Sequence, residues 1–318
     1  MTDTRRAILD ALADGPADGP TLADRLDVSR AAIWKHVEAL REAGFAIQSG
    51  DDGYRITAVP EYGGPAVAYG LDAPYEVEYH DSIGSTNDRA RQLPAEGAPE
   101  TVVVADEQTG GRGRLDREWS APSGGVWLSV FARPSLPPAR VPLLTMAAAV
   151  ATAEAAREAG VDARIKWPND VLVERDGDVR KLAGILTEME GEADRVSWVV
   201  VGVGVNANVD PADLPDGSTS LRAERAHAGR DPADIDRRTF AQRVIERFHE
   251  CRGDPDAVLP AWRDRSDTLG RRVRVDTPGG EVVGEAVDVE PPGTLVVETA
   301  EGVRRVSAGD CEHLRPAE

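Results

Sequence analysis

Two of the three lysines in the chain fall close together, where a compact cation could take part in chemistry. Lys166 opens the segment Lys166-Trp-Pro-Asn-Asp170, and Lys181 opens Lys181-Leu-Ala-Gly-Ile-Leu186. The other basic residues are arginines, 37 − 3 = 34 of them, and an arginine would serve equally well in an ordinary surface salt bridge. An ammonium group beside an acyl phosphate neutralises an attacking carboxylate and a phosphate as charge builds in the transition state. These lysines therefore indicate a site that activates an anionic substrate.

A second segment alternates glycine with arginine, in Asp106-Glu-Gln-Thr-Gly-Gly-Arg-Gly-Arg114. A flexible surface loop would explain the glycines but not the alternation. Guanidinium groups make bidentate contacts with phosphates and carboxylates. The pattern predicts a loop that orders on an anionic ligand. It is not a Walker A loop, because no Gly-Lys-Ser/Thr follows.

Two further segments have residues that a structural role alone does not fully explain. Asp81-Ser-Ile-Gly-Ser-Thr-Asn87-Asp88 follows a predicted strand and could simply cap a helix, although a helix start also gathers free donors for a ligand. Gly202-Val-Gly-Val-Asn206-Ala207 mimics a dinucleotide fingerprint, but prolines follow where a helix should begin. We therefore reject the dinucleotide reading and expect glycine backbone close to a ligand.

An α/β unit must position these segments. Helices are expected over 87–92, 142–159 and 237–251. The strands expected from apolar runs are 76–80, 101–106, 126–131, 164–167, 181–190 and 196–202.

The N-terminal residues predict a winged helix. The pattern predicts a first helix over 4–14, a second capped by Thr21 and running to Leu26, and a third capped by Ser29 and running to about Ala43. A hairpin follows around residues 50–53. Such units bind DNA through the third helix, or serve as protein-interaction modules. Residues 1–58 carry seven Lys/Arg against ten Asp/Glu, which is not the basic balance that phosphate contact favours. The candidate DNA-contacting residues are Ser29, Arg30, Trp34 and Lys35.

The predicted domains are residues 1–59 for the winged helix-turn-helix, 60–74 for a linker rich in Pro and Gly, 75–265 for the α/β unit and 266–318 for a small β-barrel. The barrel is predicted from short strands separated by Pro-Gly-Gly, Pro-Pro-Gly and Glu-Gly turns.

Composition narrows the class of protein. The net charge of −19, from 56 acidic and 37 basic residues, is spread along the chain and indicates a solubilising surface, for which a salt-rich cytoplasm is one cause. The two cysteines, Cys251 and Cys311, have neither metal-site spacing nor the number that a disulfide framework needs. Without a long apolar run or a signal peptide, we expect a cytoplasmic protein with no membrane segment and no protein-built metal site.

The order of these motifs closely resembles that of the biotin protein ligases, over nearly the whole chain. Lys-Trp-Pro-Asn-Asp together with the Gly-Arg-Gly-Arg loop is highly specific. With a winged helix in front and a barrel behind, the chain resembles the bifunctional class that also represses biotin operons. The resemblance implies a class II synthetase-like catalytic domain of the α/β (α+β) type and an SH3-like C-terminal barrel.

The resemblance also implies residue roles. Lys166, Arg112 and Arg114 would be catalytic, and Asn169, Asp170, Lys181 and Asn206 would line the nucleotide and Mg²⁺ side. The residues implied to contact biotin are Ser85, Thr86, Asn87, Gln108, Gly111, Arg112, Gly113, Arg114, Lys166, Gly202 and Gly204.

One departure concerns the glycine–arginine loop, which in the family continues to a further glycine and here has Leu115-Asp116. An aspartate near an anionic ligand would loosen the loop's hold on the adenylate.

The implied reaction uses ATP, Mg²⁺ and biotin, makes biotinyl-adenylate and passes biotin to a lysine of a biotin carboxyl carrier protein. The implied partners are that carrier, operator DNA and a second copy of the chain. The alternatives are a biotin-sensing repressor without ligase activity, a lipoate ligase, and a ligase whose winged helix no longer binds DNA. Intact Lys166, Arg112 and Arg114 argue against the first, and Lys-Trp-Pro-Asn-Asp argues against the second.

Overall fold

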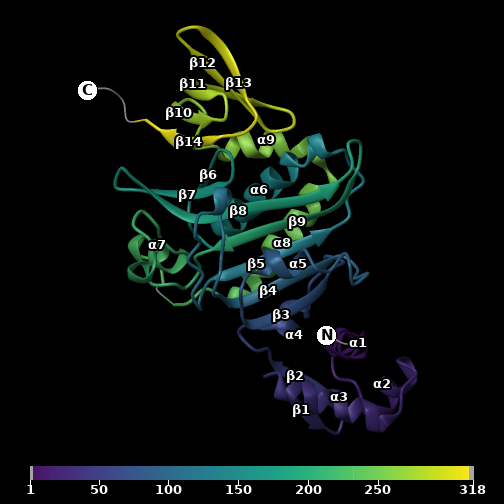
Figure 1. Cartoon of the computed structure of the whole chain (residues 1–318). Coiled ribbons are helices and arrows are strands. Elements are labelled where there is room, and N and C mark those ends of the chain that lie inside the picture. The colour runs from purple at the N-terminus through teal and green to yellow at the C-terminus, as the bar shows by residue number, and fades with distance from the viewer. Residues whose placement is uncertain (1–2, 232, 315–318) are drawn as a thin grey trace.

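A computed structural model describes residues 3–231 and 233–314 of the chain. The chain runs from a helical N-terminal unit through a central mixed sheet to a C-terminal β-sheet at the opposite end of the molecule (Figure 1).

The N-terminal unit is the predicted three helices and hairpin. Its elements are α1 (Asp3–Ala13), α2 (Gly19–Arg25), α3 (Arg30–Glu42), β1 (Ala46–Gly50) and β2 (Gly53–Ala58). Ile8, Ile33 and Val37 are fully buried in its core, as their helical spacing requires. Ser29 caps α3 by accepting from the amide of Ala32, as predicted.

Thr21 does not cap α2. The helix starts two residues earlier and is capped by Asp18, whose carboxylate accepts both the amide and the hydroxyl of Thr21. An aspartate also satisfies free N–H groups at a helix start, and Pro20 fits in the first turn.

The segment predicted as a linker, residues 60–74, is not a free tether. It contains the short helix α4 (Gly64–Ala68), which packs against strand β3 (Glu76–Ile83) and helix α8 (Arg237–Gly253). Ala66, Val67 and Ala68 are buried with the central core. Small apolar residues among the glycines and prolines therefore attach this segment to the central unit.

The central sheet has seven strands in the order β3-β4-β5-β9-β8-β7-β6. Only β3 and β4 are parallel; every other neighbouring pair is antiparallel. The remaining strands are β4 (Thr101–Gln108), β5 (Val126–Ala132), β6 (Ala163–Lys166), β7 (Asp170–Arg175), β8 (Asp178–Gly191) and β9 (Val196–Val205).

The two faces of this sheet have different covers. One face packs on the alanine-rich helix α6 (Pro142–Glu158), with α8 and α9 (Pro255–Arg265) against it. The other face carries α5 (Thr86–Ala90), which contacts β4, β5 and β9 (Figure 1). Because α5 is only five residues long, part of this second face remains available for a pocket. Helix α7 (Leu221–His227) follows β9 and was not predicted.

The C-terminal unit is a five-stranded antiparallel sheet in the order β13-β12-β11-β10-β14. Its strands are β10 (Arg272–Thr277), β11 (Gly280–Glu290), β12 (Thr294–Thr299), β13 (Gly302–Val306) and β14 (Asp310–His313). The first four correspond to the predicted strands, and β14 is an addition.

Hydrogen bonds attach this unit to the central one. Trp167 donates its indole N–H to the carbonyl of Gly293 (2.9 Å) and its amide to Thr268 Oγ1 (2.9 Å). Trp167 is buried, so these bonds fix the strand end that carries Lys166 against the C-terminal unit. Within residues 3–231 and 233–314, no helix is both long and apolar enough to cross a membrane.

Candidate active site

A cavity of about 160 Å³ opens on the α5 side of the central sheet. It lies among α5, strands β8 and β9 and the loop of residues 109–122, here called the arginine loop. Twelve of the residues selected from the sequence line it: Ser85, Thr86, Asn87, Gln108, Arg112, Gly113, Arg114, Asn169, Asp170, Lys181, Gly202 and Gly204.

One corner of the cavity is a buried polar cluster. Gln108 Oε1 accepts the amide (2.8 Å) and the hydroxyl (3.0 Å) of Thr86. The hydroxyl of Ser129, which is fully buried, lies 2.7 Å from Thr86 Oγ1 and 2.6 Å from Asn87 Oδ1. These groups come from α5, β4 and β5, and they fix one another's orientation, so they form a rigid set of donors and acceptors.

Ser129 was not among the residues selected from the sequence. It lies inside an apolar strand, Val126–Ala132. A serine at a fully buried strand position must find a polar partner, and that requirement was the available signal.

Glycines form the wall beside this cluster. A Cβ atom added at Gly202 would lie 2.2 Å from Asn87 Oδ1, and one added at Gly204 would lie 2.7 Å from the indole nitrogen of Trp119. No side chain fits in either place. The close approach of a ligand to this glycine backbone stays a prediction; the groups that approach the two glycines in this structure are Asn87 and Trp119.

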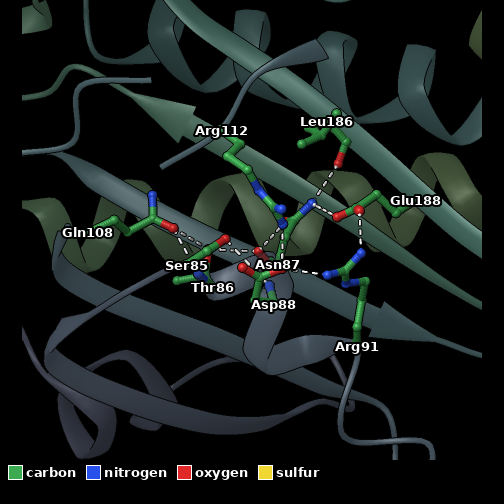
Figure 2. A network of polar contacts seen from close by, with 10 residues as sticks. Ser85, Thr86, Asn87, Asp88, Arg91, Gln108, Arg112, Leu186 and Glu188 are labelled. Atoms are coloured by element: carbon green, nitrogen blue, oxygen red, sulfur yellow. Dashed lines mark hydrogen bonds and ion pairs between the residues drawn. The ribbon is translucent and has the colours of Figure 1, made fainter. Parts of the chain in front are cut away.

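A chain of ion pairs connects the arginine loop, α5 and β8 (Figure 2). Arg112 pairs with Asp88 on α5, and Arg91 pairs with the same carboxylate (2.6 Å) and with Glu188 (2.9 Å). Glu188 Oε2 in turn accepts the side-chain amide of Asn87 (2.8 Å). Arg112, which lines the cavity, is therefore held by a carboxylate of the protein itself.

Arg114 connects the arginine loop to Asn169 of the central unit and to the C-terminal unit. Its guanidinium donates to Asn169 Oδ1 (3.1 Å) and to the carbonyl of Gly309 in the C-terminal unit (2.8 Å). Burial lowers the pKa of Arg114, and the carboxylates of Asp310 and Asp170 oppose that shift. Arg117 is ion-paired with Asp310, so the loop is held at two points by the residues before and at the start of β14.

The two lysines lie in different surroundings. Lys181 lines the cavity, with Nζ 2.7 Å from Asp170 Oδ1 and 5.1 Å from the centre of the Trp119 ring. Lys166 ends β6 opposite Asp170 and is not among the residues that line the cavity. Burial raises the pKa of Cys311 to about 11, and the nearby Lys166 ammonium opposes that rise.

Two other selected residues lie behind the lining. Asn206 is buried and donates to the carbonyl of Thr219 (2.9 Å), while its Oδ1 has no hydrogen-bond partner among the described residues. Gly111 accepts the amide of Trp119 through its carbonyl (3.0 Å), and a Cβ there would lie 2.4 Å from Trp119 O.

Trp119 was also missed. Its ring lies over Gly184 and Gly204 and under Lys181, and its indole nitrogen is buried without a partner in the part of the chain that the structure describes. The signal was a large aromatic residue in a polar, arginine-rich loop. Leu115, in the same loop, has a left-handed backbone (φ 57°) and is 74% exposed; the side chain of Asp116 lies outside those that the structure describes.

The residues selected for DNA contact are the N-cap of α3 and three of the first six residues of that helix. Ser29, Arg30, Trp34 and Lys35 are all exposed, and Trp34 is 59% exposed although its ring is apolar. Single exposed apolar residues are common, but a tryptophan this exposed on the third helix is available for contact with a partner.

The residues described here contain no group of three or more His, Cys, Asp or Glu that could hold a metal ion.

Three family models match the chain. Residues 79–206 match the biotin/lipoate A/B protein ligase family, residues 268–314 match the biotin protein ligase C terminal domain, and residues 4–63 match an HTH domain. These matches fall on the three structural units described above.

Individual relatives agree with these matches. A bifunctional ligase/repressor BirA of Bacillus subtilis (strain 168) is 36% identical over 309 residues, covering 92% of this chain and 93% of the relative. A biotin protein ligase from Aquifex aeolicus in complex with biotin and ATP superposes with a TM-score of 0.61 and 25% identity, covering 75% of this chain and 99% of that one.

A biotin protein ligase from Leishmania major in complex with biotinyl-5-AMP gives a TM-score of 0.52 at 26% identity, covering 74% of this chain and all of that one (100%). Since a relative above 30% identity aligns with almost all of the sequence and each unit has its own matching model, this chain belongs to the biotin protein ligase family.

Proposed function

We propose that this protein activates biotin with ATP to biotinyl-adenylate, releasing pyrophosphate, and then transfers the biotin to a lysine of a biotin carboxyl carrier protein. The observation that carries the proposal is the cavity itself. The cavity combines the polar groups of Thr86, Asn87 and Gln108 with the cationic side chains of Arg112, Arg114 and Lys181. A neutral, hydrogen-bonding head group with a carboxylate tail matches that distribution of polarity.

The polar cluster suits the ureido head of biotin, which both donates and accepts hydrogen bonds. Thr86, Asn87 and Gln108 supply hydroxyl and amide groups, while Gly202 leaves room beside them. The proposed biotin contacts also include Ser85, Gly111, Gly113 and Gly204. Because the cluster is already hydrogen-bonded, binding requires little reorganisation.

The cationic side chains of the cavity suit the carboxylate of biotin and the α-phosphate of ATP, between which the new bond forms. Arg112 and Arg114 supply guanidinium forks, and Lys181 supplies an ammonium at the cavity wall. Lys166 is proposed to reach the reacting carboxylate from the end of β6. Asn206, whose buried Oδ1 has no hydrogen-bond partner among the described residues, is proposed to support the nucleotide side of the site.

Mg²⁺ fits this site as an ion that arrives with ATP. It keeps several waters and takes one or two protein carboxylates together with phosphate oxygens. Asp170 is the carboxylate at the cavity wall, next to Asn169. When bound, the ion would offset the charge of the departing pyrophosphate.

The arginine loop has a second proposed task. The mixed anhydride of biotin and AMP reacts with water, so a loop that closes over it preserves it for the carrier lysine. Gly309 and Asp310, which hold Arg114 and Arg117, would fasten the closed loop.

Pyrophosphate exchange into ATP tests the first half-reaction, with wild type compared with Lys166→Ala over a range of KCl. We expect exchange that requires biotin, with a loss of about 100-fold or more in the variant. Lys35→Ala is the matched control, because it removes the lysine of the winged helix and should leave exchange unchanged. Absence of biotin-dependent exchange at every salt concentration would favour a biotin-sensing repressor without ligase activity.

We further propose that the winged helix makes the protein a biotin-responsive transcriptional repressor. The observation in favour is the exposure of Arg30, Trp34 and Lys35 at the start of α3. The matching HTH model and the bifunctional relative support the same assignment. Selection from a pool of random DNA duplexes, with biotin and ATP present, should enrich an inverted repeat. Arg30→Ala should abolish the enrichment while leaving pyrophosphate exchange intact.

The finer architecture is proposed on the same basis. We assign residues 1–59 to the winged helix-turn-helix, 60–74 to the connecting segment, 75–265 to a class II synthetase-like catalytic domain and 266–318 to an SH3-like barrel. A homodimer and a cytoplasmic location are part of this proposal.

A further inference from the structure

Arg237, the first residue of α8, lies between the connecting segment and the central sheet. Its Nε and Nη2 donate to the two carboxylate oxygens of Glu61 (2.9 and 2.8 Å), and its Nη1 donates to Asp106 Oδ1 (2.6 Å). The Arg237 side chain is only 11% exposed. A single guanidinium therefore joins residues 45 positions apart in the sequence, one before the central sheet and one within it.

Asp106 stands at the base of the arginine loop. Its other oxygen, Oδ2, accepts the hydroxyl of Ser123 (2.6 Å). Between these residues, the amide of Gln108 donates to the carbonyl of Ala121 (2.9 Å). The N-terminal and C-terminal ends of the arginine loop are thus hydrogen-bonded to each other beside Arg237. A shift of Asp106 therefore moves both ends of the loop.

Packing holds the other side of Arg237. The guanidinium carbon lies 4.3 Å from the centre of the Tyr62 ring, and that ring meets Tyr79 of β3 edge-on, with centroids 6.0 Å apart. The Tyr62 hydroxyl is buried and has no hydrogen-bond partner among the described residues. Glu61 and Tyr62 therefore attach to the central unit through a stacked, charged contact.

The same segment carries the winged helix. Phe45 of the winged helix meets Tyr69 edge-on at 5.9 Å, and Arg6 of α1 donates to the carbonyl of Tyr75 (3.0 Å). The N-terminal unit thus touches the chain at two points that follow α4. Its placement depends on how the segment from Glu61 to Tyr75 is held.

We propose that Arg237 is a positioning residue that couples the arginine loop to the segment carrying the winged helix. When the loop closes on its ligand, Ser123 and Asp106 adjust together, and Arg237 transmits the change to Glu61 and Tyr62. Coupling of this kind acts equally in both directions. The placement of the winged helix therefore affects how firmly the loop holds its ligand. The ligand-dependent part of this inference rests on the proposed ligase function; the mechanical part does not.

Amide hydrogen exchange on the full chain tests the coupling without any ligand. We compare wild type with Glu61→Gln, which removes the negative charge that pairs with Arg237 and keeps the shape of the side chain. Exchange in residues 107–123 should become about two- to fivefold faster, the range expected for loss of one partly exposed ion pair. Asp72→Asn is the control, because it removes the same charge from the same segment at an exposed residue whose side chain makes no ion pair among the described residues. It should leave residues 107–123 unchanged.

The second arm adds biotin and ATP. In wild type, both the arginine loop and residues 59–70 should gain protection; in Glu61→Gln, only the loop should do so. In steady-state exchange of pyrophosphate, Glu61→Gln should raise KM for biotin about two- to fivefold and leave kcat unchanged. A residue that serves stability alone would not produce that split.

Unchanged exchange of residues 107–123 in unliganded Glu61→Gln would overturn the coupling. Equal effects of Glu61→Gln and Asp72→Asn would also overturn it, since loss of charge alone would then explain the result. Failure of biotin and ATP to protect the wild-type loop would contradict the ligase function instead, while the unliganded comparison would still decide the coupling.

Discussion

At the residue scale, the cations of the cavity are paired with groups of the protein itself. Arg112 pairs with Asp88, Lys181 with Asp170, and Arg114 donates to Asn169. An anionic ligand must displace or share these partners, and the free energy of doing so is subtracted from its binding. The carboxylates on α5 and β7 therefore help to set the affinity for the ligand.

Replacing Asp88 with asparagine should strengthen biotin binding. Asp88 holds Arg112 and adds negative charge near an anionic substrate, and the pair is about one-third to two-fifths exposed (35% and 41%). Removing an ion pair of that exposure changes binding by about 0.2–1 kcal/mol. We expect KM for biotin to fall up to about fivefold in pyrophosphate exchange. Glu107→Gln is the control, because it removes an exposed carboxylate from β4, just before the arginine loop. A rise in KM for Asp88→Asn would mean that Asp88 orients Arg112 for the ligand.

Asp267 should stabilise the junction between the central and C-terminal units in a pH-dependent way. Burial raises its pKa, but pairing with His313 (3.4 Å) and the hydrogen bond from Arg271 (2.7 Å) outweigh burial, and the net pKa is lowered. Its amide donates to the carbonyl of Ile165 (2.8 Å), which places it at the junction. Asp267→Asn should therefore lower the free energy of unfolding by about 1–3 kcal/mol at pH 7.

The sign of the pH effect follows from the lowered pKa. A carboxylate with a depressed folded-state pKa contributes stability above its unfolded pKa and loses it as pH falls through the folded value. The difference in urea-unfolding free energy between wild type and Asp267→Asn should thus be full above about pH 4 and shrink below it. A difference that is independent of pH would rule out the carboxylate charge as the cause.

At the element scale, the site depends on the close approach of α5 and the arginine loop to β9. Gly202 faces Asn87, and Gly204 faces Trp119. Neither contact can form over a side chain, so two short polar segments lie directly on the strand backbone. The approach places a hydrogen-bonding cluster and an aromatic ring on adjacent parts of one wall.

Gly202→Ala should therefore damage the biotin site more than the fold. The new methyl group would lie 2.2 Å from Asn87 Oδ1, and Asn87 must move away from Ser129 and Glu188. Losing that hydrogen-bonded geometry should raise KM for biotin about tenfold or more. Gly253→Ala is the control, because a Cβ there meets nothing within 4 Å. Equal KM values for both variants would show that Asn87 does not contact biotin.

At the scale of the whole molecule, charge is the dominant feature. A net charge of −19 creates repulsion across the surface, while ion pairs such as those of Glu158 with Arg243 (2.6 Å) and Arg247 (3.2 Å) connect α6 to α8. Salt screens both the repulsion and the ion pairs. Because acidic residues are in excess, the loss of repulsion outweighs the loss of attraction, and salt should stabilise the fold.

Raising KCl from about 0.1 M to about 1 M should consequently raise the thermal midpoint of unfolding, by about 5 °C, as the Debye length falls from about 10 Å to about 3 Å. Differential scanning calorimetry measures the shift. Sucrose at matched osmolality separates screening from water exclusion. A midpoint that falls steadily with KCl would show that the ion pairs outweigh the repulsion.

The sequence by itself determined most of the elements, with α4, α7 and β14 among the exceptions, and twelve of the residues that line the cavity. Helical spacing in residues 29–43 and apolar runs in the central unit are local signals, and each produced the expected element. Chemistry carried in short segments was equally visible, since packing does not explain the choice of lysine over arginine at Lys166 and Lys181 or the glycine–arginine alternation. The helix cap at Asp18 was missed because Thr21 is also a good cap residue.

Only the tertiary structure decided which of these residues meet. Ser129 and Trp119 became part of the site through pairings between β5 and β9 and through the return of the arginine loop, which no local pattern encodes. The packing of α4, the fastening of Arg114 by Gly309 and the joining of Glu61 to Asp106 by Arg237 are likewise long-range contacts. A sequence pattern records what one segment prefers. Which distant side chain satisfies a buried donor or charge is settled only when the units pack together.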